Sequence, residues 1–177
     1  MRTLVTRLLV GAAVVAAYGF LGYFTQGKFN DPDRYFHLTL SRWAHESGTL
    51  IPRVFPTFEF LGWHEYFPDK EALFHVWLNL GYKVGGENGA VYAALLAAYG
   101  FVAFFFWYAS RRLPLLPALA VTLVTAFSPV IFFRYQYLRA FVLASFGMLL
   151  IHLGLLERRK WLAGIGAFVF AMAYHAH

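Results

Sequence analysis

Long apolar runs are the feature that most constrains what this chain can fold into. Residues 8–24 contain no charged side chain, and four further apolar stretches follow residue 88, separated by short polar turns. An apolar helix of about 20 residues matches the roughly 30 Å hydrocarbon core of a membrane. Only 14% of the residues are charged, whereas soluble domains carry about 25%. The sequence therefore predicts an all-α integral membrane protein.

The pattern predicts five transmembrane helices, at residues 5–25, 89–110, 113–133, 139–156 and 161–177. A cleaved signal peptide is the alternative for the first, because small residues follow its basic start. Its apolar run continues past those small residues, which favours a retained helix. We expect the chain to be the N-terminal part of a longer membrane protein, and a naturally short five-helix protein is the alternative.

Basic residues lie mainly at the ends of these runs, at Arg2, Arg7, Arg111, Arg112, Arg158, Arg159 and Lys160. Lys and Arg are enriched on the cytoplasmic side of membrane helices. The N-terminus is therefore predicted to be cytoplasmic and the loop 26–88 periplasmic or extracellular, as in a bacterial inner-membrane protein. Nucleic-acid binding would need a basic stripe on a soluble face, so the net charge of +6 does not indicate it. The chain has no cysteine, which excludes disulfides and thiol chemistry.

The loop 26–88 is the polar part of the chain and contains eight of its nine carboxylates. Asp31 followed by Pro32 is typical of a helix start, and Gly48 of a helix end. These signals predict a helix at residues 32–46.

A second loop helix is predicted at residues 68–82, with Pro68 in its first turn. Glycines at positions 81, 85 and 86 are expected to break it before the next span. Both loop helices are predicted to be amphipathic and to lie along the membrane face. In the third span, Pro129 is expected to produce a kink or an end.

Two clusters in this loop could carry chemistry. Asp31 and Asp33 could act as a general base or hold a hard divalent cation, although capping of the helix explains them equally well. Glu71 and His75 are four residues apart, so they share a helix face, and Asp69 falls in the first turn. Acids at a helix start are also common without any chemical role.

A third set is predicted on the same side of the membrane and contains Arg134, Arg139 and His175. Arginine suits the recognition of a phosphate or pyrophosphate headgroup. Anchoring of the arginines among lipid headgroups is the alternative.

The loop motifs resemble those of the GT-C membrane glycosyltransferases, which include oligosaccharyltransferase catalytic subunits, protein O-mannosyltransferases and lipid A aminoarabinose transferases. In the first branch an acidic residue after the first span precedes a Tyr-Tyr-His-Leu-like run, and the matching residues here are Asp31, Asp33, Tyr35, Phe36, His37 and Leu38. In the other branches a Phe-Glu-Lys-Pro-Pro-like run ends the loop, and Phe67, Asp69 and Lys70 match it loosely.

The resemblance implies transfer of a sugar from a polyprenyl-phosphate donor to an acceptor on the non-cytoplasmic face. The expected catalytic residues are Asp31, Asp33, Asp69 and Glu71, and the expected substrate-binding residues are Arg34, His37, Lys70, His75, Arg134, Arg139 and His175. Asp31 and Asp33 are also the expected ligands of a divalent cation, Mg or Mn. A non-catalytic subunit of a larger membrane complex is the alternative, whereas no intramembrane acid supports a transporter.

Overall fold

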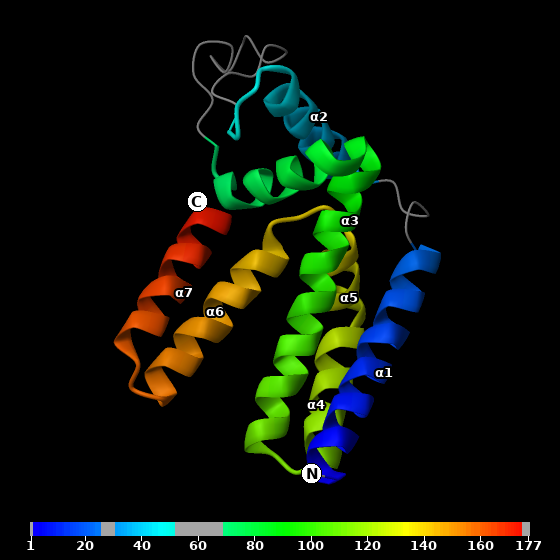
Figure 1. Cartoon of the computed structure of the whole chain (residues 1–177), viewed down its shortest axis with the longest axis vertical. Coiled ribbons are helices and arrows are strands. Elements are labelled where there is room, and N and C mark those ends of the chain that lie inside the picture. The colour runs from blue at the N-terminus through cyan, green and yellow to red at the C-terminus, as the bar shows by residue number, and fades with distance from the viewer. Residues whose placement is uncertain (1, 26–30, 52–68, 175–177) are drawn as a thin grey trace. The chain divides into compact units, whose positions relative to one another are not determined.

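The computed structural model describes residues 2–25, 31–51 and 69–174, and this part of the chain is helical, without strands. The seven helices are α1 (Arg2–Thr25), α2 (Pro32–Glu46), α3 (Ala72–Arg112), α4 (Leu115–Phe127), α5 (Pro129–Gln136), α6 (Phe141–Leu156) and α7 (Lys160–Ala173) (Figure 1). The predicted all-α class is confirmed.

Two of the described helices, α1 and α3, are long and apolar enough to cross a membrane, and α4 with α5 makes a third if the bent pair is one span. The helices α6 and α7 contain 16 and 14 residues, which at 1.5 Å per residue makes each shorter than the roughly 30 Å core. The described part of the chain thus has two or three candidate spans, and the predicted number of five is not confirmed.

The predicted kink in the third span is confirmed. The helices α4 and α5 are bent by 63° at their junction, where Ser128 separates them and Pro129 occupies the first turn of α5. Proline has no N–H and its ring clashes with the preceding turn, so it begins a new helix more easily than it continues one.

The first predicted loop helix is found at its predicted bounds, whereas the second is not. Helix α3 begins at Ala72 instead of residue 68. Asp69 explains the later start, because its Oδ1 accepts the backbone N–H of Glu71 at 3.0 Å and so satisfies a donor of the first turn. The predicted first-turn residue Pro68 lies outside the described residues, as does most of the stretch between the two helices.

A break inside α3 replaces the predicted end at residue 82. The backbone leaves helical geometry at Gly85 and at Gly86, whose φ of 61° favours glycine. The helix folds back on itself here, since a Cβ at Gly81 would lie 2.5 Å from the carbonyl oxygen of Gly89. The indole of Trp77 also donates to the carbonyl of Ala93 at 2.7 Å.

The chain divides into two compact units, and α3 contributes to both. The first unit comprises Met1–Asn30 and Leu95–Tyr137, and the second Asp31–Ala94 and Leu138–His177. In the first unit the fully buried ring of Tyr18 meets Tyr99, Phe127 and Phe132 edge-on, at centroid distances of 5.2–6.0 Å. Such aromatic contacts join α1 to α3, α4 and α5.

In the second unit, α6 and α7 form a closely packed antiparallel hairpin (Figure 1). A Cβ at Gly166 would lie 2.6 Å from the carbonyl oxygen of Gly147, and one at Gly154 would lie 2.4 Å from the backbone nitrogen of Ala163. Small residues at an interface let two helix backbones approach closely, as is usual for packing inside a membrane.

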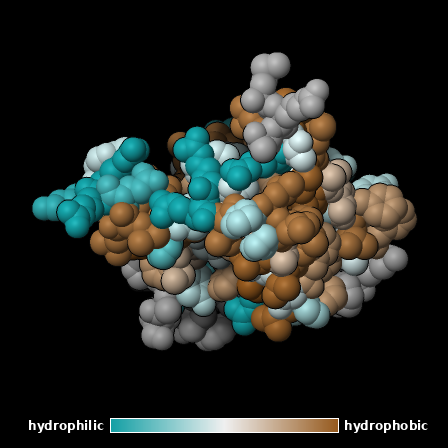
Figure 2. Space-filling model, turned by 90° about the horizontal axis from the view of Figure 1, so that it is seen from below, coloured by the Kyte–Doolittle hydropathy of each residue, from teal (hydrophilic) through white to brown (hydrophobic). Residues whose placement is uncertain are grey.

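Much of the surface shown in Figure 2 is apolar. Large hydrophobic side chains are exposed along the candidate spans, for example Leu4, Leu8, Leu9, Phe20, Tyr92, Leu96, Leu116 and Val124. Soluble proteins rarely expose apolar surface on this scale, and its position on the long apolar helices is compatible with a lipid environment.

Candidate functional site

The candidate site lies in the second unit, where the start of α2 and the start of α3 supply most of its polar side chains. Asp31 is the N-cap of α2, and its Oδ1 accepts the backbone N–H of Asp33 at 3.3 Å. Its side chain is buried, with 4% of its area exposed. A buried carboxylate at a helix start gains from the helix dipole, but it also needs a positive partner.

Arg139 is that partner and also binds Asp33. Its Nη2 lies 3.0 Å from Oδ1 of Asp31, and its Nη1 lies 2.8 Å from Oδ2 of Asp33. The guanidinium therefore bridges two carboxylates that are two residues apart. The Asp33 side chain is half exposed and Arg139 is 41% exposed, so this end of the site is open to solvent.

Two histidines form the buried end of the site. Nδ1 of His37, on α2, lies 2.8 Å from Nε2 of His75, on α3. Nδ1 of His75 is bonded to Asp69, at 2.7 Å to Oδ1 and 2.9 Å to Oδ2. The side chains of His75 and Asp69 are almost completely buried. Asp69 therefore orients the imidazole of His75 inside the protein.

These contacts fix which nitrogen of each ring carries a proton when both imidazoles are neutral. An ionised Asp69 can only accept, so Nδ1 of His75 donates to it and Nε2 of His75 carries a lone pair. Nδ1 of His37 then donates to that lone pair, which leaves Nε2 of His37 as an acceptor.

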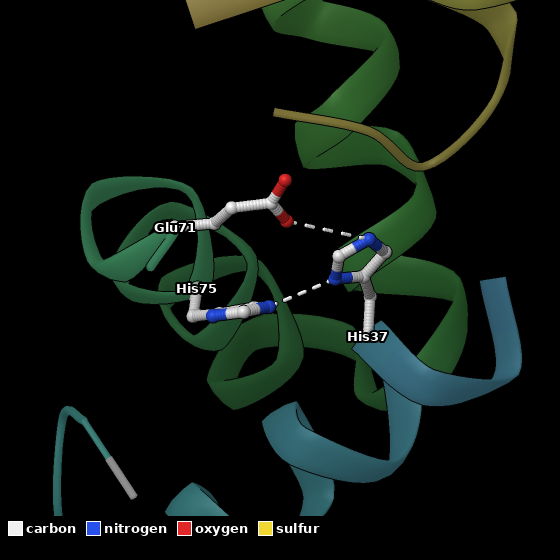
Figure 3. Close-up of side chains that lie close together, drawn as sticks. All are labelled: His37, Glu71 and His75. Carbon is white, nitrogen blue, oxygen red and sulfur yellow. Dashed lines mark hydrogen bonds and ion pairs between the residues drawn. The ribbon is translucent and has the colours of Figure 1, made fainter. Parts of the chain in front are cut away.

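Glu71 completes the cluster from the turn before α3. Its Oε2 lies 3.7 Å from Nε2 of His37. A dashed line marks this contact in Figure 3. Burial raises the pKa of Glu71, although the nearby His75 opposes the shift. Burial, followed by the neighbouring charges of His75 and Arg139, holds the pKa of His37 well below its usual value. His37 is thus held neutral at physiological pH.

Aromatic rings enclose the two imidazoles. The ring of Phe74 meets His37 edge-on at a centroid distance of 5.2 Å, and Phe36 meets both histidines at 5.3 and 6.1 Å. Phe74 is fully buried. The apolar surroundings strengthen the polar contacts inside the cluster.

Seven of the predicted site residues lie together in this cluster, which we call the His–carboxylate cluster: Asp31, Asp33, His37, Asp69, Glu71, His75 and Arg139. Two of the others lie beside it in the chain, Arg34 half-buried and Lys70 exposed. Arg134 belongs to α5 in the first unit, and His175 lies outside the described residues.

Sequence reasoning missed Asn79, which holds the loop beyond α2 in place. Its fully buried side chain donates to the backbone carbonyls of Thr49 and Leu50, at 2.9 and 3.3 Å. Asn79 lies one turn beyond His75 on a helix with an apolar face, and a polar residue at such a position is the sequence signal that could have identified it.

The expected Mg or Mn ligands, Asp31 and Asp33, do not fit a cation shared between them in this arrangement. The guanidinium of Arg139 already bridges the two carboxylates, and it supplies the positive charge that a bridging ion would bring. The nitrogen-rich half of the cluster has a different donor set. His37, Glu71 and His75 each offer one ligand atom, and these atoms all lie within 4.8 Å of one another.

Comparison of the chain with protein-family models, curated proteins and solved structures finds no match. Membership of the GT-C superfamily therefore stays a prediction from the loop motifs.

Proposed function

We propose that this chain is a membrane glycosyltransferase, or the N-terminal part of one, which transfers a sugar from a polyprenyl-phosphate donor to an acceptor. The observation that carries the proposal is the contact of His37 with His75, which joins the two acidic helix starts into one cluster. Without this contact, helix capping would be enough to explain the carboxylates at each helix start. A shared cluster of carboxylates, imidazoles and one arginine has the groups that acid–base chemistry needs.

Asp33 is the residue best placed to act on the acceptor. It is the half-exposed carboxylate of the cluster, so a hydroxyl or amide from solution can reach it. The carboxylate would deprotonate or orient that group while it attacks the sugar. Asp31 is buried and caps α2, so its role is to position Arg139 and the helix start.

Arg139 is the proposed contact for the donor phosphate. A guanidinium presents its N–H donors in a planar fork that matches phosphate oxygens, and the Arg139 side chain is 41% exposed at the open end of the cluster. Stabilising the charge that develops on the departing phosphate lowers the barrier for transfer.

We propose that the polyprenyl tail of the donor lies in the membrane lipid against the apolar helices. We place the cluster on the non-cytoplasmic face, because Arg7, Arg111 and Arg112 mark the opposite ends of the candidate spans. A bacterial inner membrane fits this topology.

A transfer assay in isolated membranes tests the proposal. The variant Asp33→Asn keeps the size and most hydrogen bonds of the side chain but cannot act as a base. We expect it to accumulate normally and to lose sugar transfer by at least about 100-fold, the usual contribution of a general base. The matched control is Glu46→Gln, an exposed acid at the other end of α2, which should transfer at the wild-type rate. Wild-type transfer by Asp33→Asn would overturn the proposal.

A further inference from the structure

Three side chains of the cluster come from two elements and converge on one point. Glu71 lies in the turn before α3 and His75 lies four residues later in its first turn, and His37 faces them from α2 (Figure 3). Their ligand atoms lie within 4.8 Å of one another, and both imidazoles are buried. The arrangement brings two nitrogen donors and one oxygen donor together beside solvent, since the Glu71 side chain is 28% exposed.

We propose that His37, Glu71 and His75 bind one divalent first-row transition-metal ion, of which zinc is the best match to this donor set. Two imidazoles and one carboxylate are a recurrent set of three protein ligands, and they leave a fourth position for water or substrate. The proposal rests on these contacts and goes beyond the sugar transfer proposed above.

The two imidazole nitrogens are already close to the spacing that the ion needs. Two imidazole nitrogens at about 2.0–2.1 Å from a tetrahedral zinc lie roughly 3.3 Å apart. Nδ1 of His37 and Nε2 of His75 are 2.8 Å apart, so the rings need to separate by only a few tenths of an ångström. In the metal-free pair, Nδ1 of His37 donates to Nε2 of His75. On metal binding the proton of His37 would move from Nδ1 to Nε2, so that Nδ1 offers its lone pair to the ion.

Asp69 prepares His75 for this role. A metal-binding histidine usually donates its other ring N–H to a carboxylate, which fixes the tautomer and raises the basicity of the ligand nitrogen. The bond from His75 Nδ1 to Asp69 has that geometry, at 2.7 Å and buried on both sides. It directs the Nε2 lone pair towards His37 and the proposed ion.

The donor atoms decide which cation suits this point. Two imidazole nitrogens and one carboxylate oxygen converge there. Nitrogen ligands select zinc and its neighbours over Mg, which prefers oxygen throughout.

Titration with Co²⁺ followed by competition with Zn²⁺ tests the proposal on the purified full chain in detergent. We expect one equivalent of Co²⁺ to give the visible absorption of a four- or five-coordinate ion, and Zn²⁺ to displace it. The variants His37→Gln and His75→Gln should lose this site, and Asp69→Asn should weaken it by about 10–100-fold. His45→Gln is the matched control, because His45 is exposed on the same helix as His37, and its binding should equal that of the wild type.

X-ray absorption at the zinc edge gives a second measurement that needs no variant. The wild-type chain loaded with one equivalent should show two imidazole ligands at about 2.0 Å. A zinc spectrum without imidazole ligands would overturn the proposal, and so would the absence of Co²⁺ and Zn²⁺ binding. The proposal would also be overturned if His45→Gln lost as much metal binding as His37→Gln and His75→Gln. Metal binding without sugar transfer would count against the proposed function alone, and sugar transfer by a chain that binds neither Co²⁺ nor Zn²⁺ would count against the metal site alone.

Discussion

The imidazoles of His37 and His75 lie 2.8 Å apart although 38 positions separate them in the chain. Each histidine lies on the first turns of a helix whose start carries carboxylates, Asp31 and Asp33 for α2 and Asp69 and Glu71 for α3. The contact therefore unites two helix starts that each look ordinary alone. Their union is the basis for treating this part of the molecule as a site.

Asp31 and Asp33 should differ in their effect on stability. Asp31→Ala removes a helix cap and a mostly buried partner of Arg139, and we expect it to cost about 2 kcal/mol or more. Asp33→Ala removes a half-exposed partner of the same arginine and should cost about 1 kcal/mol or less. Thermal unfolding in detergent measures both. An equal fall in Tm for the two variants would contradict the burial seen here.

The folded-back start of α3 should be sensitive at Gly81 and tolerant at Gly85. A Cβ at Gly81 would lie 2.5 Å from the carbonyl oxygen of Gly89, whereas one at Gly85 would meet nothing within 4 Å. We expect Gly81→Ala to destabilise by about 1–3 kcal/mol, as overpacking usually does. Gly85→Ala serves as the control in the same thermal measurement, and a similar loss in both would show that the close approach does not exist.

The α6–α7 hairpin offers a comparable pair on a single helix. A Cβ at Gly166 would lie 2.6 Å from the carbonyl oxygen of Gly147, and Gly164 faces open space. Gly166→Ala should therefore lower Tm. Gly164→Ala should leave Tm unchanged or raise it, because alanine favours helix by up to about 1 kcal/mol. The opposite order of the two variants would contradict the packing.

Local signals in the sequence predicted much of the fold. The start of α2 at Pro32 and the break at Pro129 follow from residues that act on their own backbone, and the apolar runs predicted the helical class. The number of spans was less predictable, because length and hydropathy alone do not say whether the 14-residue α7 crosses the membrane.

The site was predictable in its residues but not in its contacts. The i, i+4 spacing of Glu71 and His75 predicts that they share one face. The partners His37 and Asp69 could not be inferred by such spacing. One meets His75 from another helix, and the other reaches it across the non-helical turn before α3. Long-range pairing depends on how the chain folds back, and no local pattern encodes it.

The central claim is that the two helix starts act as one sugar-transfer site, and a double-variant cycle tests it most directly. Asp33→Asn alters the start of α2 and Glu71→Gln alters the turn before α3. Sugar transfer from a polyprenyl-phosphate donor is measured for each variant and for the pair, because residues that act as a unit give non-additive losses. We predict that the activity of the double variant is only slightly lower than that of the less active single variant. Losses that multiply, or full activity in both single variants, would contradict the account.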